Sequence, residues 1–123
     1  MYKKYIFSLN MTLKINNEDI TLVYSFRSAL YFEQITGHNL DFNTLSANDL
    51  VTLFYSVVIA SLQKAKKPVI TMIDFLDVVD DNGGDKCLTD FTTWYVEILK
   101  AQYEVLTQEE DKKTKKLSKK KTN

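Results

Sequence analysis

The 123-residue sequence contains one cysteine, one proline and three glycines. A lone cysteine, Cys87, excludes an intrachain disulfide and favours a reducing compartment. The scarcity of helix-breaking residues favours long helices joined by short connections. The longest apolar segment, residues 51–62, is too short to cross a bilayer. We therefore expect a single cytoplasmic domain that does not associate with membranes.

The residue types that build catalytic and metal sites are also scarce. His38 is the only histidine, so a histidine-based metal site or catalytic triad would need partners that the sequence does not offer. The acidic turn at residues 80–85 resembles a calcium loop. With Gly83 at position six of an EF-hand, however, Val78 and Thr89 fall at positions one and twelve, where carboxylates are required. The sequence also lacks a glycine-rich phosphate loop, so we expect neither an enzyme nor a cofactor.

Acidic residues are absent from residues 112–123, which contain seven lysines. Because the whole chain has sixteen basic and sixteen acidic residues, residues 1–111 carry nine basic and sixteen acidic side chains, a balance of −7. In the segment 107–123 the only apolar residue is Leu117, so we expect a disordered basic tail. An acidic body disfavours nucleic-acid binding by the folded domain, although a lysine-rich tail has weak, sequence-independent affinity for phosphate backbones.

Apolar and polar residues alternate along the N-terminal part of the chain. The alternation runs from Phe7 to Ile15 and resumes from Ile20 to Phe26, after the polar link at residues 16–19. A period of two on both sides of a short Asn/Asp-rich link predicts a β-hairpin over residues 5–26 with one buried face. An isolated hairpin is marginally stable in water, so this one is expected to pack on helices.

Helical spacing and capping residues predict four helices, at about residues 28–36, 46–64, 72–80 and 87–106. Gly37 is a typical residue to follow the end of the first helix. Ser46 and Asp49 have the spacing of a capping box at the start of the second, and Thr71 and Asp74 repeat that pattern at the third.

The second predicted helix is apolar on nearly all sides. Such a helix lies at the centre of a core or is shared with another subunit, which would allow weak self-association. The predicted fold class is therefore α+β. A β-hairpin packs on a bundle of about four helices within one domain of residues 1–106, and a disordered lysine-rich tail follows at 107–123.

The order of these elements resembles that of siphophage tail assembly chaperones from Gram-positive phages and prophages. Residues 26–37, Phe-Arg-Ser-Ala-Leu-Tyr-Phe-Glu-Gln-Ile-Thr-Gly, are similar to the first helix of that family, with its Phe-Glu pair and Thr-Gly ending. A leucine-rich helix and then a short acidic helix follow in the family, as residues 50–62 and 73–77 do here. The resemblance covers about residues 10–105, and the sequence departs from it in a longer first strand and a lysine-rich tail.

The resemblance implies a protein that binds the tape measure protein and helps the tail-tube protein to polymerise around it. Such a protein acts in the host bacterial cytoplasm and is absent from the mature virion. An acidic helical module would bind a long helical client through spare apolar surface on its helices. The candidate residues for that surface, each of which could instead fill the core, are Val51, Tyr55, Ile59, Trp94, Tyr95 and Tyr103.

Two alternatives belong to other functional classes. One is a structural virion component of the neck or tail-completion type, which would use the edge of the hairpin for assembly. The other is an accessory protein that associates with nucleic acid through its basic tail. Detection in purified particles would favour the first, and binding that depends on residues 112–123 would favour the second.

Overall fold

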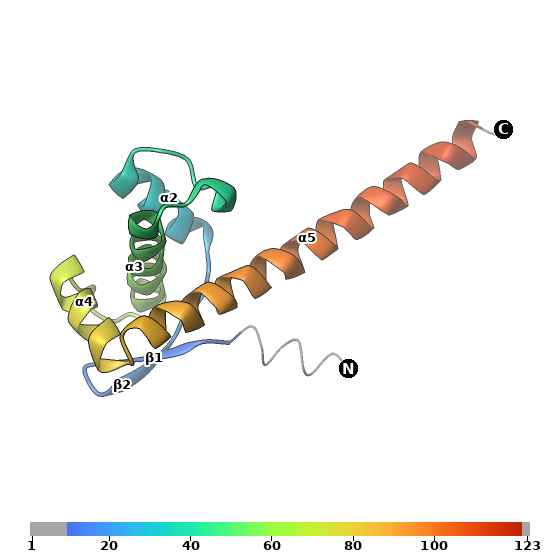
Figure 1. The fold of residues 1–123 in the computed structure, drawn as a ribbon. Coiled ribbons are helices and arrows are strands. Elements are labelled where there is room, and N and C mark those ends of the chain that lie inside the picture. The colour runs from blue at the N-terminus through green and yellow to red at the C-terminus, as the bar shows by residue number, and fades with distance from the viewer. Residues whose placement is uncertain (1–9, 122–123) are drawn as a thin grey trace.

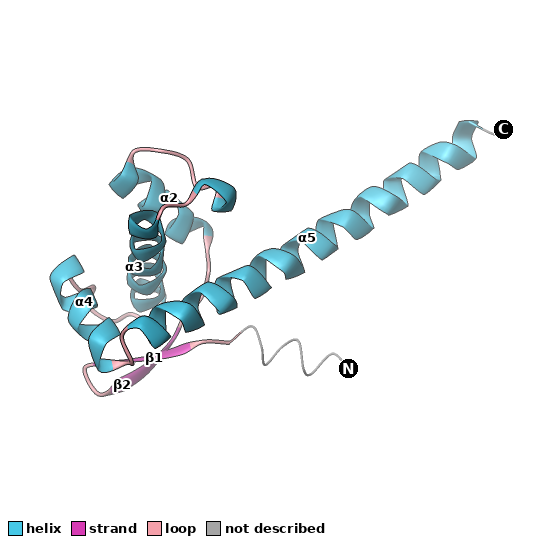
Figure 2. Ribbon diagram, viewed as in Figure 1, coloured by secondary structure: helices cyan, strands magenta, loops and turns pink. Residues whose placement is uncertain are grey.

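The fold is that of a computed structural model, which describes the backbone of residues 10–121 and the side chains of residues 10–103. A two-stranded antiparallel sheet precedes four α-helices, as Figures 1 and 2 show. The α+β class with an N-terminal hairpin is therefore confirmed. In chain order the elements are β1 (Thr12–Ile15), β2 (Glu18–Thr21), α2 (Phe26–Thr36), the 3-10 helix η1 (Phe42–Thr44), α3 (Ala47–Lys64), α4 (Met72–Asp81) and α5 (Asp85–Lys121).

The hairpin is shorter and tighter than the alternation predicted. Ile15 pairs with Glu18, so the turn contains only Asn16 and Asn17. Both have positive φ angles, 52° and 66°, which is the backbone of the type I′ turns that match the twist of paired strands. The predicted four-residue link was therefore wrong, because its last two residues already belong to β2. The buried face of the hairpin consists of Leu13, Ile15, Ile20 and Leu22.

The chain leaves the sheet before residue 26, where the prediction had placed the end of the hairpin. Ser25 instead caps α2, and its hydroxyl and that of Ser28 form a reciprocal capping box. Phe26 is thus the first residue of a helix, and its side chain is 79% exposed rather than on the buried face. The local hydrogen bonds of the cap outweigh the weak alternation at the end of the second strand. The predicted strand residues 5–9 lie outside the described part of the chain.

Helix α3 occupies the centre of the core, which is one of the two positions expected for a helix that is apolar on nearly all sides. Its capping box between Ser46 and Asp49 is the one that the sequence predicted. The ring of Phe54 stacks on that of Phe91 of α5, with 4.3 Å between ring centres. It also packs edge-to-face with the ring of Phe75 of α4, with 5.0 Å between ring centres. One α3 side chain thus contacts two other helices. The buried residues of α3 are Leu53, Phe54, Ser56, Val57, Val58, Ala60, Ser61 and Leu62.

Two polar side chains fasten the hairpin region to the helices. The Ser61 hydroxyl accepts a hydrogen bond from the Val23 amide at 2.9 Å and donates to the carbonyl of Val57 at 2.7 Å. Asn82, which follows α4, accepts from the Lys14 amide at 3.1 Å and donates back to the Lys14 carbonyl at 2.9 Å. Both side chains satisfy backbone groups that the two-stranded sheet leaves open.

Helix α5 is the main departure from the predicted architecture. It begins at Asp85, the last residue of the predicted turn at 80–85, within which Gly83 and Gly84 have φ angles of 114° and 62°. Its helical backbone continues to Lys121, beyond the predicted end at residue 106. The disorder expected of residues 107–123 stays a prediction. Lysine, glutamate and glutamine have high helix propensity, and neither glycine nor proline follows Gly84. Figure 1 shows the distal part of α5 extending away from the other helices.

Candidate functional site

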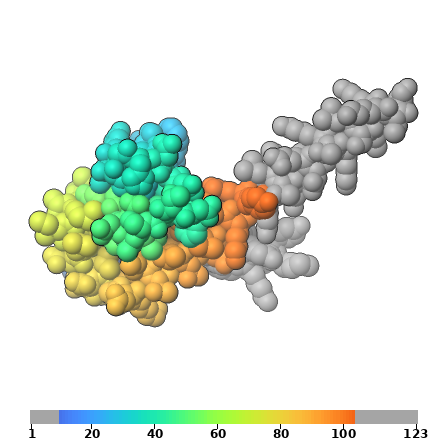
Figure 3. Space-filling model, turned by 45° about the horizontal axis from the view of Figure 1, so that its top comes forward, coloured from blue at the N-terminus to red at the C-terminus, as the bar shows by residue number. Residues whose placement is uncertain are grey.

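An apolar groove lies where η1 meets α5, with a volume of about 300 Å³. Its walls come from Phe42 on η1 and from Val96, Leu99, Lys100 and Tyr103 on α5. The four α5 residues occupy positions i, i+3, i+4 and i+7 of the helix, so they share one face. Tyr103 is 71% exposed and Phe42 is 39% exposed. In Figure 3 the teal segment that contains η1 lies beside the orange part of α5. We call these five residues the apolar groove.

Local structure explains why Phe42 reaches this position. The Asp41 carboxylate accepts a hydrogen bond from the Asn43 amide at 3.0 Å and so caps the short helix η1. The ring of Phe42 then packs against Tyr95 of α5, with 5.9 Å between ring centres. Tyr95 anchors one side of Phe42, while the other side contributes to the groove.

The structure places the six predicted surface residues in three different environments. Trp94 and Tyr95 are 4% and 2% exposed and belong to the core, so their prediction as surface residues was wrong. The helical stripe that contains them faces α3 rather than solvent. Burial and the neighbouring Tyr24 also raise the pKa of the Tyr95 phenol, which therefore stays neutral. Tyr103 is the predicted residue that lines the apolar groove.

The three predicted residues on α3, which we call the α3 group, are Val51, Tyr55 and Ile59, and all three are partly buried. Val51 and Tyr55 pack against the core from its periphery, and Ile59 is half-buried on the same helix. The Tyr55 hydroxyl donates to the Ile70 carbonyl at 2.7 Å, and its ring lies 5.4 Å from that of Phe75. Tyr55 thus helps to hold the connection before α4. The α3 group lies apart from the apolar groove, whose lining includes none of its residues.

A second exposed apolar surface lies on the outer side of α4. Ile73 is 74% exposed and Leu76 is 46% exposed. Asp80 is exposed and shares this side by helical spacing, and the exposed Asp77 lies at its margin, where it also lines the polar cleft described next. We call these four residues the α4 face. This face was not predicted, although the sequence signal for it is an isoleucine and a leucine three residues apart, next to aspartates.

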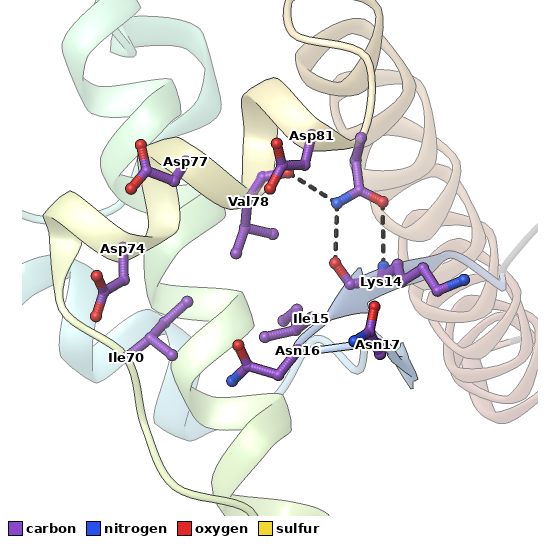
Figure 4. Close-up of a pocket in the computed structure, with 10 residues that line it drawn as sticks. Lys14, Ile15, Asn16, Asn17, Ile70, Asp74, Asp77, Val78 and Asp81 are labelled. Carbon is purple, nitrogen blue, oxygen red and sulfur yellow. Dashed lines mark hydrogen bonds between the residues drawn. The ribbon is translucent and has the colours of Figure 1, made fainter.

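A polar cleft of about 480 Å³ lies between α4 and the hairpin turn (Figure 4). Asp74, Asp77 and Asp81 line it from α4, and Asn16 and Asn17 line it from the turn. Within the part of the chain that the structure describes, no group of three histidine, cysteine, aspartate or glutamate residues has the geometry to hold a metal ion. The cleft is therefore negatively charged, but its carboxylates are not arranged to coordinate a metal ion.

The histidine and the cysteine have separate structural environments. The ring of His38 bonds to the Asn39 carbonyl at 3.1 Å and to the Asp49 carboxylate at 3.2 Å. The backbone bond to Asn39, and then Asp49, raise the pKa of His38 above its usual value. Cys87 is buried in the core, and burial raises the pKa of its thiol. A thiol held in its protonated form is a poor nucleophile.

Comparison of the chain with protein-family models, curated proteins and solved structures found no match to any of them. Among the described residues, including the long α5, no helix combines the length and the apolar character needed to cross a bilayer.

Proposed function

We propose that this protein is a phage tail assembly chaperone, which binds the tape measure protein and assists assembly of the tail tube. It would act in the host bacterial cytoplasm and would not remain in the mature virion. The resemblance of residues 26–37 to the family supports the proposal, together with the order of hairpin, leucine-rich helix and short acidic helix. The observation that carries it is the apolar groove, an exposed surface suited to another polypeptide.

The shape and chemistry of the groove suit a helical client. Tyr103 and Phe42 offer aromatic surface, and aromatic anchors account for much of the binding energy at protein interfaces. An amphipathic helix would place its apolar stripe against Phe42, Leu99 and Tyr103. Lys100 at the margin would then favour an acidic residue beside that stripe.

Co-expression with the tape measure protein of the same phage or prophage tests this proposal. We expect the tagged chain to capture the tape measure protein and keep it soluble. Tyr103→Ala should weaken the capture by about thirtyfold, the lower end of the range for an interface hot spot. Gln102→Ala is the matched control, because Gln102 is an exposed neighbour on the same turn that does not line the groove.

Two results would contradict the proposal. The first is the absence of any complex between the wild-type chain and a soluble, helix-rich tape measure protein. The second is the presence of the chain at fixed copy number in purified virions, which would favour a structural neck or tail-completion component.

A further inference from the structure

The α4 face combines exposed apolar side chains with a local excess of negative charge. Ile73 and Leu76 are 74% and 46% exposed. Asp80 lies on the same side of the helix with Asp77 at its margin, and the segment 68–85 contains no lysine or arginine. A partner for this surface must cover aliphatic side chains and neutralise carboxylates at the same time.

The chain itself contains a segment with the complementary chemistry. Residues 112–121 carry seven lysines and no acidic residue, and their backbone is the last part of α5. Lysine side chains lay their aliphatic stems along apolar surface while the ammonium group remains at a charged or wet position. A lysine-rich helix can therefore cover Ile73 and Leu76 and pair with the neighbouring aspartates.

The geometry of α5 prevents this contact within one molecule. Helix α5 starts next to α4 and runs away from it (Figure 1). At a rise of 1.5 Å per residue, residue 112 lies about 40 Å along the helix from Asp85. The lysine-rich segment therefore cannot reach the α4 face of its own chain while α5 remains helical.

We propose that the lysine-rich end of α5 binds the α4 face of a second copy of this chain. If two copies place their α5 helices antiparallel, each end reaches the α4 face of the other, which closes a symmetric dimer. The contact uses a different surface from the apolar groove. Its existence does not depend on the proposed chaperone function.

Sedimentation velocity of the purified, nuclease-treated full-length chain tests this inference. At about 0.01 M salt, where the Debye length is roughly 30 Å, we expect a concentration-dependent dimer, and at about 1 M salt we expect a monomer. The double variant Asp77→Lys/Asp80→Lys should weaken association by about tenfold or more. The control Glu33→Lys/Gln34→Lys/Asn39→Lys changes the net charge by the same amount on α2 and the loop after it, away from both α4 and α5, and should associate as the wild type does.

A charge swap provides the second test. A chain with all seven lysines of residues 112–121 replaced by glutamate should be monomeric alone. Mixed with Asp77→Lys/Asp80→Lys, it should form a heterodimer, because every contact again joins opposite charges. Loss of folding cannot produce this rescue.

Several outcomes would overturn the inference. The first is a wild-type chain that is monomeric at low salt. The second is a control variant that weakens association as much as Asp77→Lys/Asp80→Lys does. The third is failure of the two swapped chains to associate. Association that disappears on nuclease treatment would assign the lysine-rich segment to nucleic acid instead.

Discussion

At the scale of single residues, Ser61 is the clearest case of a side chain that links distant parts of the chain. Its hydroxyl satisfies the Val23 amide while also bonding to the Val57 carbonyl. Ser61→Ala would leave that amide without its partner, so we expect a loss of about 1–2 kcal/mol in the free energy of unfolding. Urea denaturation, monitored by tryptophan fluorescence, measures this loss in the free energy of unfolding.

Ser56 provides a control on the same helix. It is also buried, but its hydroxyl bonds only within α3, to the Thr52 carbonyl at 2.8 Å. Ser56→Ala removes no bond from another element and introduces a better helix former, so its cost should be below about 0.5 kcal/mol. Equal losses for the two variants would show that the link between Ser61 and Val23 contributes little.

Residues whose partners are close in sequence could be predicted, and those with distant partners could not. The capping pairs Ser46–Asp49 and Thr71–Asp74 span three residues, so their spacing was sufficient. Asn82 bonds to a strand residue 68 positions away. Nothing in the local sequence identifies that partner, because the contact exists only after the hairpin packs beside α4.

At the scale of secondary-structure elements, the type I′ turn at Asn16 and Asn17 sets the register of the hairpin. Asn17 has a φ of 66°, a region that β-branched residues strongly avoid. Asn17→Val should therefore reduce the free energy of unfolding by about 1–2 kcal/mol, as measured by urea denaturation. Asn17→Gly, which adopts this φ without strain, should be neutral or slightly stabilising. A valine variant as stable as the glycine variant would contradict this account.

Also at the scale of secondary-structure elements, the caps and the helical spacing explain which helices could be predicted from the sequence. Helices α3 and α4 carry strong caps and clear spacing, so their bounds match the prediction closely. The candidate surface was predicted less well. Trp94 and Tyr103 belong to one helix, and spacing alone did not show that the first is buried in the core while the second is exposed. Phe42 was missed because η1 has only three residues and no periodic signal.

At the scale of the whole molecule, the chain separates a compact acidic body from a long basic helix. Among the residues whose side chains the structure describes, Leu99 is the last α5 residue of the hydrophobic cluster. Composition alone identified the change in charge near residue 112 correctly. It did not identify the helix, because low hydrophobicity argues against burial but does not prevent a lysine-rich segment from being helical.

This separation predicts that the body folds without the distal helix. A chain ended at residue 106 retains the whole hydrophobic cluster, so its melting temperature should stay within about 2 °C of that of the full-length chain, both measured at high salt. Its far-UV circular dichroism signal per molecule should fall, because the helix of residues 107–121 is removed. A large drop in melting temperature would instead mean that the distal helix packs on its own body. An unchanged signal per molecule would mean that the distal segment is not helical in solution.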